Sequence, residues 1–150
     1  MIIKENVSWI NYYNDTFDGM DSNKTGKWMI FFDIQDPESY EYIQEICKDI
    51  IEKNILEVVK HTNLISAEIQ NLNQGVAVFY LEYDDIDSHK KIITYLLEKE
   101  MIPKTKSGRY YKNSFKLDSQ TRNKEYGDTF TGKITLDQFI DLETGEWIYK

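Results

Sequence analysis

The sequence predicts an α+β fold in which a mostly antiparallel sheet has two main helices packed on one face. Two amphipathic helical patterns are separated by a run of short segments with strand composition, and turn residues join these segments as hairpins. No linker rich in Gly, Ser or Pro and no internal repeat divides the 150 residues. Residues 1–150 are therefore expected to form a single α+β domain.

The first firm strand is expected at residues 26–33, after a polar loop at residues 14–25. The run GKWMIFFD is almost continuously apolar and aromatic, which is typical of a buried central strand. Trp28 lies in the middle of this run and is expected in the core.

The first helix is expected at residues 37–53. Asp36 supplies an N-cap, and Pro37 fits the first helical position, where no backbone N–H is needed. Apolar residues then recur at helical spacing, so that one stripe should pack on the sheet: Tyr40, Ile43, Ile46, Cys47, Ile50 and Ile51. The outer face is acidic, and is either simply solvated or a contact surface for a partner: Glu38, Glu41, Glu45, Asp49 and Glu52.

Three strands are expected between the two helices, at residues 55–60, 66–72 and 75–83. The third is the strongest of these, and residues 71–75 (NLNQG) have the composition of a hairpin connection. The second helix is expected at residues 87–100, with preceding aspartates that can cap it.

The remaining elements are a strand at residues 109–117, a long polar loop at 118–130 and a short strand at 133–136. The first of these carries part of the only basic stretch of the chain.

The net charge of the chain is −8, but residues 101–125 carry seven Lys or Arg against two acids, a local charge of +5. We call residues 104–124 the basic segment. It is either a solvated face balanced by the acidic remainder or a site for an anionic ligand. In the second case the side chains that would contact phosphate are Arg109, Lys112, Lys116 and Arg122. The rings that would stack on a planar group are Tyr110, Tyr111 or Phe115.

Motifs for catalysis, cofactor binding and metal ligation are scarce. The sequence has no GxGxxG, GxxxxGK[ST] or GxSxG motif, a single Cys and two His. His89 stands beside two lysines at a helix start and is expected to be exposed. His61 lies in a turn-like composition and is expected to have a structural or solvent role. No catalytic residue, cofactor or metal is predicted, and an enzyme acting on a phosphorylated substrate is the least favoured alternative.

Cys47 is the only cysteine and falls inside a helical pattern, which favours a reducing compartment. The longest apolar run, residues 76–81, is far too short to span a membrane, and residues 1–13 lack the apolar stretch of a signal peptide. The expected location is cytoplasmic, with no membrane contact.

A series of short motifs resembles a known family. The motifs are GKWMIF at residues 26–31, VAVFY at 76–80 with acids after it, YK at 111–112, and then Asp118, Thr121, Arg122, Tyr126 and Gly127. They are similar to the basophilic-leukaemia-expressed protein family, whose members resemble the cap-binding translation initiation factor in fold. The resemblance implies a curved antiparallel sheet backed by helices. It places Lys112, Thr121, Arg122 and Tyr126 nearest a possible ligand cleft.

The activities associated with that resemblance are not expected to carry over. Cap binding in that fold uses two tryptophans in loops, and the matching stretches at residues 14–25, 61–64 and 71–74 contain none; Phe17 is the only candidate. Some members carry a phosphothreonine-lyase label, which needs a His acid and a Lys base that no motif here supplies.

Taken together, the sequence favours a non-enzymatic acidic binding protein. The leading hypothesis is an inhibitor or immunity-type protein that occludes a basic, nucleic-acid-handling protein partner, for example a mobile-element-encoded nuclease inhibitor. Its partner-binding residues would be the five acids of the first helix. The alternative is a module that binds a nucleotide, RNA or another phosphate ligand through the basic segment, with the candidate contacts Arg109, Tyr110, Tyr111, Lys112, Lys116, Thr121, Arg122 and Tyr126.

Overall fold

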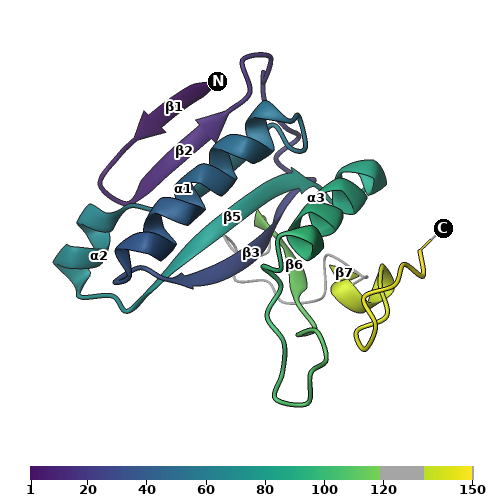
Figure 1. Cartoon of the computed structure of the whole chain (residues 1–150). Coiled ribbons are helices and arrows are strands. Elements are labelled where there is room, and N and C mark those ends of the chain that lie inside the picture. Colours follow the sequence, from purple (N-terminus) through teal and green to yellow (C-terminus); the bar gives the residue numbers. More distant parts are fainter. Residues whose placement is uncertain (119–133, 150) are drawn as a thin grey trace. The chain divides into compact units, whose positions relative to one another are not determined.

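The computed structural model describes residues 1–118 and 134–149 and has an α+β fold (Figure 1). Seven antiparallel strands form one sheet in the order β1-β2-β4-β5-β3-β6-β7. The strands of the described residues are β1 (Ile2–Glu5), β2 (Trp9–Tyr13), β3 (Thr25–Asp33), β4 (Val58–Thr62), β5 (Gln74–Glu82), β6 (Ser114–Leu117) and β7 (Ile134–Thr135). The helices are α1 (Pro37–Glu52), α2 (Leu64–Gln70) and α3 (Ile86–Glu98), with a 3-10 turn at Leu136–Gln138.

The strongest sequence patterns correspond to the elements that they predicted. The strands expected at residues 26–33 and 75–83 are β3 and β5, and the helices expected at 37–53 and 87–100 are α1 and α3. The start of α1 is also as predicted, since the Asp36 side chain accepts a hydrogen bond from the Glu38 amide and Pro37 occupies the first helical position.

The chain divides into two compact units. Unit 1 comprises Met1–Gly19 and Met29–Leu81, and unit 2 comprises Met20–Trp28 and Glu82–Lys150. The two units share strand β3, whose first four residues belong to unit 2 and whose remainder belongs to unit 1. The expectation of a single domain stays a prediction.

In unit 1, α1 packs on β2 and β4 (Figure 1). Side chains alternate between the two faces of a strand, and the register places Tyr12 of β2 beside Val59 of β4 and Val59 beside Phe79 of β5. All three are fully buried, together with Ile50 of α1. This row forms the centre of the unit 1 core.

Helix α2 corrects the expectation of a strand at residues 66–72. Asn63 caps the helix start by accepting a hydrogen bond from the Ile65 amide, and Asn71 ends it in the left-handed conformation with φ 55°. Ser66 and Ala67, adjacent in sequence, are both buried, a pattern that a strand with alternating faces does not give. Residues 71–75 are consequently not a hairpin loop, because residues 71–73 connect α2 to β5, and Gln74 and Gly75 begin that strand.

The strand expected at residues 55–60 is also shifted. It is β4, Val58–Thr62, so His61 lies within a strand instead of in a turn. β4 pairs with both β2 and β5, and His61 takes part in both pairings. This pairing outweighs the turn-like composition around His61 in setting the position of the strand.

In unit 2, Trp28 is the centre of an aromatic core. It is 2% exposed and contacts the rings of His89 of α3, Phe115 of β6 and Phe139. β6 pairs with the start of β3, where a Cβ on Gly26 would overlap the Phe115 ring. Glycine is therefore required for this close approach.

The C-terminal elements are shorter than expected. The strand expected at residues 109–117 is confined to β6, and the one expected at 133–136 is the two-residue β7 followed by a 3-10 turn. Apart from Asp118, the polar loop expected at 118–130 lies outside the described residues. Among the described residues, no helix combines the length and the apolar content needed to cross a membrane.

Truncation of Trp28 should be strongly destabilising. Trp28→Ala removes a fully buried indole and is expected to lower the free energy of unfolding by about 3–5 kcal/mol. Urea denaturation followed by circular dichroism measures this change. Trp147→Ala is the control, because Trp147 is 39% exposed and its loss should cost less than about 1 kcal/mol. Equal losses in the two variants would contradict a core role specific to Trp28.

Candidate functional site

The outer side of α1 carries five carboxylates, which we call the acidic face: Glu38, Glu41, Glu45, Asp49 and Glu52. At 100° per residue, these positions fall within about 80° of the helix circumference. All are exposed except Asp49, which is half-buried and forms an ion pair with Lys53 at 3.1 Å. The stripe predicted from the sequence is therefore a real, solvent-facing surface.

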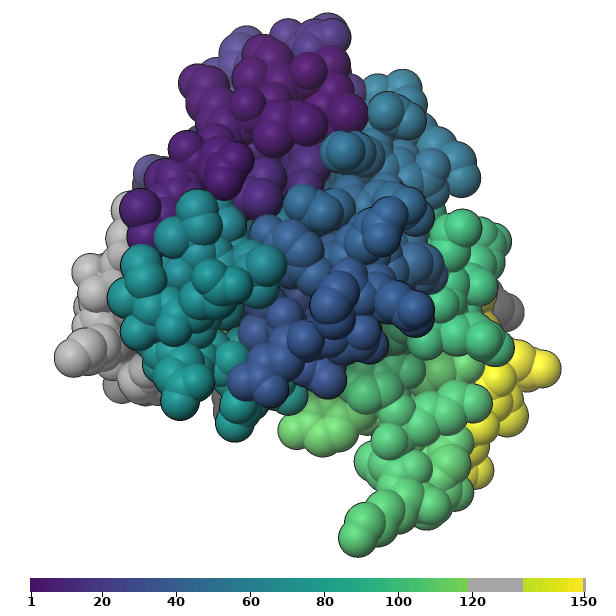
Figure 2. All heavy atoms as spheres, turned by 60° about the vertical axis from the view of Figure 1, so that its left-hand side comes forward, coloured from purple at the N-terminus to yellow at the C-terminus, as the bar shows by residue number. Residues whose placement is uncertain are grey.

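The acidic face also includes an aromatic side chain. Tyr42 lies within one turn of Glu38 and Glu45 and is 44% exposed. Exposed tyrosine next to charge is common at protein–protein contacts, because the ring offers apolar area and the hydroxyl a hydrogen bond. Figure 2 shows α1 in blue, open to solvent beside α2 in teal.

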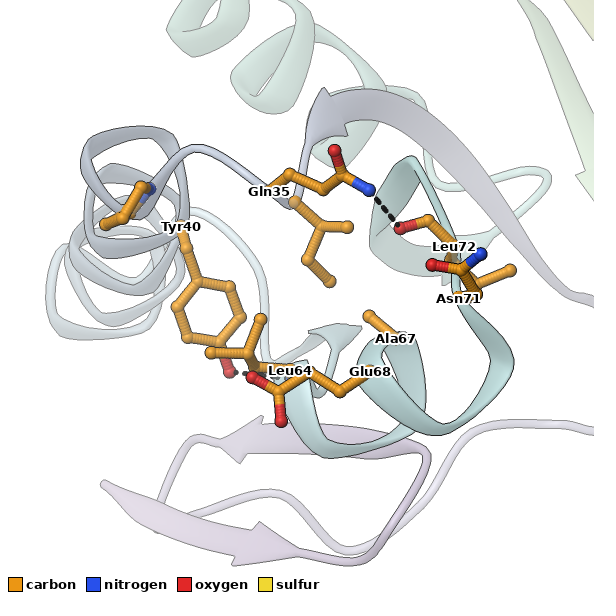
Figure 3. A pocket seen from close by; sticks show the side chains of 9 residues that line it. Gln35, Tyr40, Leu64, Ala67, Glu68, Asn71 and Leu72 are labelled. Atoms are coloured by element: carbon orange, nitrogen blue, oxygen red, sulfur yellow. Dashed lines mark hydrogen bonds between the residues drawn. The ribbon is translucent and has the colours of Figure 1, made fainter.

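A pocket of about 500 Å³ lies where the end of β3, the start of α1 and helix α2 meet (Figure 3). Its apolar lining comes from Ile34, Pro37, Leu64, Ala67 and Leu72. The volume is within the range of small-ligand and side-chain pockets. It shares the first turn of α1 with the acidic face.

Hydrogen bonds fix two walls of this pocket. The Leu64 amide donates to the Tyr40 hydroxyl at 3.2 Å, and the Tyr40 ring extends from α1 toward Leu64 along one side of the pocket (Figure 3). The Gln35 amide nitrogen donates to Asn73 Oδ1 at 2.9 Å and to the Leu72 carbonyl at 3.4 Å. Burial raises the pKa of Tyr40, so its hydroxyl stays neutral.

Glu68 is the only charged side chain that lines the pocket among the described residues. It is exposed, and within that part of the chain its carboxylate forms neither an ion pair nor a hydrogen bond. Figure 3 shows it extending from α2 toward the Tyr40 side of the pocket. The sequence did not indicate this pocket, because the residues of α2 have a strand-like pattern.

The described part of the basic segment, residues 104–118, belongs to unit 2 and comprises much of the connection between α3 and β6, β6 itself and Asp118. Residues Lys104 and Tyr110 face each other across a β-bridge, with the Lys104 ammonium 4.9 Å from the Tyr110 ring centre. Arg109 is 3.9 Å from Glu143, and Lys112 is 3.5 Å from Asp137. Acids of the C-terminal segment therefore neutralise two of the predicted phosphate contacts.

The other predicted residues of this site are dispersed. Tyr111 is 57% exposed and Lys116 is exposed on β6, whereas Phe115 is buried against Trp28 and cannot stack on a ligand. Thr121, Arg122 and Tyr126 lie outside the described residues. Among the described residues of the basic segment, the predicted contacts therefore differ: Tyr111 and Lys116 are exposed, whereas Phe115 is part of the core.

His61 is part of the unit 1 core. It is fully buried, its Nδ1–H donates to the Thr62 carbonyl at 2.9 Å, and its Nε2 accepts from the Tyr12 hydroxyl at 2.8 Å. The Tyr40 ring meets its edge at a centroid distance of 5.5 Å. The pKa of His61 is lowered by burial, so the imidazole is neutral and structural.

His89 contradicts the expectation of an exposed residue. It is fully buried in unit 2, where its Nδ1 accepts from the Trp28 indole at 3.0 Å and its Nε2–H donates to the Tyr83 carbonyl at 2.9 Å. Burial lowers its pKa as well. His89 precedes Ile92, Ile93 and Leu96 by three, four and seven residues, so helical periodicity already placed it on the buried stripe.

Within the described residues, no cluster of three or more His, Cys, Asp or Glu side chains is arranged to hold a metal ion. Cys47 is buried, and burial raises the pKa of its thiol, so it is not an activated nucleophile. The two buried histidines are each hydrogen-bonded through both ring nitrogens.

Both buried histidines should make stability depend on pH. Each has a folded-state pKa below its ordinary value of 6.5, so the unfolded chain binds more protons in this range. The free energy of unfolding should be fully maintained above about pH 7 and should fall as the pH drops through about 6.5 toward the folded-state pKa values.

Urea denaturation between about pH 7.5 and pH 5.5 measures this dependence. His89→Gln and His61→Gln should each be less stable at the higher pH but lose less stability on acidification. A wild-type stability that rises on acidification would contradict the assignment of neutral, buried imidazoles.

Comparisons with protein-family models, with curated proteins and with solved structures find no match to this chain. The resemblance to the basophilic-leukaemia-expressed protein family accordingly stays a prediction.

Proposed function

We propose that this protein is a non-enzymatic binding protein whose acidic face docks on, and occludes, a basic nucleic-acid-handling protein. The observation that carries the proposal is the geometry of that face. Its carboxylates follow one another every three or four residues along α1, one per roughly 5 Å of helix axis, and all of them except Asp49 form no ion pair with a described residue. A DNA strand has one phosphate per about 3.4 Å of helix axis. The carboxylates of the acidic face therefore form a row of anions with a spacing of the same order, and a partner's groove that binds phosphates would also bind this row.

The composition of the surface supports a protein partner. The exposed Tyr42 within the row offers an anchoring side chain of the type that contributes most to interface affinity. Carboxylates around it would accept hydrogen bonds from Arg or Lys and would speed association by electrostatic attraction. An inhibitor or immunity-type protein of this kind would compete with the nucleic acid for the same groove. A mobile-element-encoded nuclease inhibitor is one such protein.

The test compares two variants of equal net charge. The variant Glu41→Gln, Glu45→Gln and Glu52→Gln neutralises the acidic face, and the control Glu57→Gln, Glu98→Gln and Glu146→Gln neutralises three exposed acids elsewhere. A partner isolated by cross-linking in the native host is purified and titrated with wild type and both variants by calorimetry.

We expect the acidic-face variant to weaken binding by about tenfold or more, because three charge contacts are lost, and the control to change it less than about twofold. Affinity should also fall as salt rises, and a DNA duplex should compete with the protein. Equal weakening in both variants, or a partner that binds without competition from DNA, would count against the proposal.

A second candidate is the phosphate-binding module predicted for the basic segment. It is supported by the exposed ring of Tyr111 beside Lys112, and by Lys106 and Lys116, which form no ion pair with a described residue. The partial neutralisation of Arg109 and Lys112 makes it the weaker of the two.

A thermal-shift screen with nucleotides, short RNA and phosphopeptides tests this second candidate. If it holds, Lys112→Ala should reduce the shift produced by the ligand, with a loss of roughly 1.5–3 kcal/mol in binding free energy, and Tyr111→Ala should do so through lost stacking. If the segment is a solvated face, Lys112→Ala should change stability by no more than about 0.5 kcal/mol, and no ligand should shift the melting temperature.

A further inference from the structure

We propose that the pocket between α1 and α2 receives an arginine side chain of a basic protein partner. The inference rests on the proposed function, because it names the side chain that such a partner would insert beside the acidic face. Two properties of the pocket lead to it: an apolar lining that matches an aliphatic stem, and a single carboxylate placed at the end of that lining.

The apolar part suits the three methylene groups of arginine. Ile34 and Ala67 are buried, and Leu64 and Leu72 border them, so a stem lying here would be removed from water while its head group stayed at the opening. The volume of about 500 Å³ leaves room for an extended side chain and part of its backbone.

The polar groups around the opening match the head group. Glu68 is an unpaired carboxylate among the described residues and can accept two parallel hydrogen bonds from a guanidinium. Gln35 lies across the pocket from Glu68 (Figure 3) and its amide nitrogen is bound to Asn73 and Leu72, so the contact with a guanidinium is assigned to Glu68. The Tyr40 ring gives a planar surface on which a guanidinium stacks well. Lysine would use these groups less completely, since its ammonium is neither planar nor bidentate.

Continuity with the acidic face provides the charge complementarity. Pro37 and Tyr40 line the pocket, and Glu41 follows Pro37 by one helical turn, so it lies between the pocket and the rest of the acidic face. A run of basic residues of the partner that lies along α1 would therefore place one arginine within reach of the pocket and its other cations over the carboxylates of the acidic face.

The pocket can be tested with peptides and needs no knowledge of the natural partner. The ¹⁵N-labelled full chain is titrated with acetyl-Gly-Arg-Gly-amide and with the same peptide carrying citrulline, which has the shape of arginine without its charge. We expect saturable shifts of the Gln35, Leu64, Glu68 and Asn71 amides with the arginine peptide and at least a threefold weaker affinity for the citrulline peptide.

Two variants place the binding at this site. Glu68→Gln keeps the shape of the side chain and should weaken arginine binding by roughly three- to tenfold, whereas the control Glu57→Gln, an exposed acid outside the pocket, should not. Leu64→Trp enlarges a 36% exposed residue of the lining and should abolish binding, with the unperturbed part of the spectrum reporting that the fold is retained.

Three outcomes would overturn the inference. Equal affinity for citrulline or norleucine peptides would indicate an apolar pocket without charge recognition, and a lysine peptide that binds as tightly as the arginine peptide would remove the role given to the guanidinium. Shifts confined to the acidic face, or no saturable shift at all, would show that the pocket is not used.

The arginine-pocket inference and the proposed function can fail independently in these experiments. Arginine binding in the pocket with no effect of the acidic-face variant on the partner would overturn the proposed function alone. The reverse pattern would overturn only the inference drawn here.

Discussion

Burial of the apolar stripe of α1 determines which side chains unit 1 can present to a ligand. Ile43, Ile46 and Ile50 face β2 and β4, and each buried isoleucine contributes roughly 1.5–3 kcal/mol relative to exposure. Exposed ion pairs contribute between about 0 and 1 kcal/mol each. Burial of the isoleucines, and not the charges, therefore decides which face of α1 is turned toward the sheet. The carboxylates on the other side are held outward as a consequence, and self-repulsion among them is tolerated because burial elsewhere on the helix outweighs it.

The same packing connects the core to the pocket through Tyr40. Its ring touches His61 on one side and borders the pocket, and its hydroxyl holds the first turn of α2 through the Leu64 amide. His61 is in turn fixed by Tyr12 and the Thr62 carbonyl. A neutral imidazole is needed in this arrangement, because a charge there would be buried with no acidic partner among the described contacts. The shape of the pocket wall therefore depends on the protonation state of a residue that a ligand would not touch.

The sequence predicts an element correctly where its local signals, such as caps and apolar spacing, agree with the packing around that element. For α1 the cap, the proline and the apolar period all indicate the same helix, and for β3 the apolar run indicates a strand, although only alternate residues of that run are buried and Phe31 is 59% exposed. Helix α2 failed this condition: Ile65, Ala67 and Ile69 alternate as in a strand, yet two of them face solvent and the helix is set by the caps at Asn63 and Asn71. The acidic face could be derived from one helix alone. The pocket could not, because its walls come from α1, α2 and the loops that follow β3 and α2, whose packing no local pattern specifies.

The two surfaces of unit 1 would make different contributions to binding. A row of exposed carboxylates acts at a distance, raises the rate of encounter with a basic surface and loses strength as salt screens it. A largely apolar pocket with one carboxylate acts only at contact, and mutations at such a site change mainly the rate of dissociation. Since many proteins that handle nucleic acid share a basic surface, charge alone would select a class of partner. A pocket that accepts one side chain in one geometry requires a particular arginine at a particular place, and this requirement would let an acidic protein discriminate one basic partner from another.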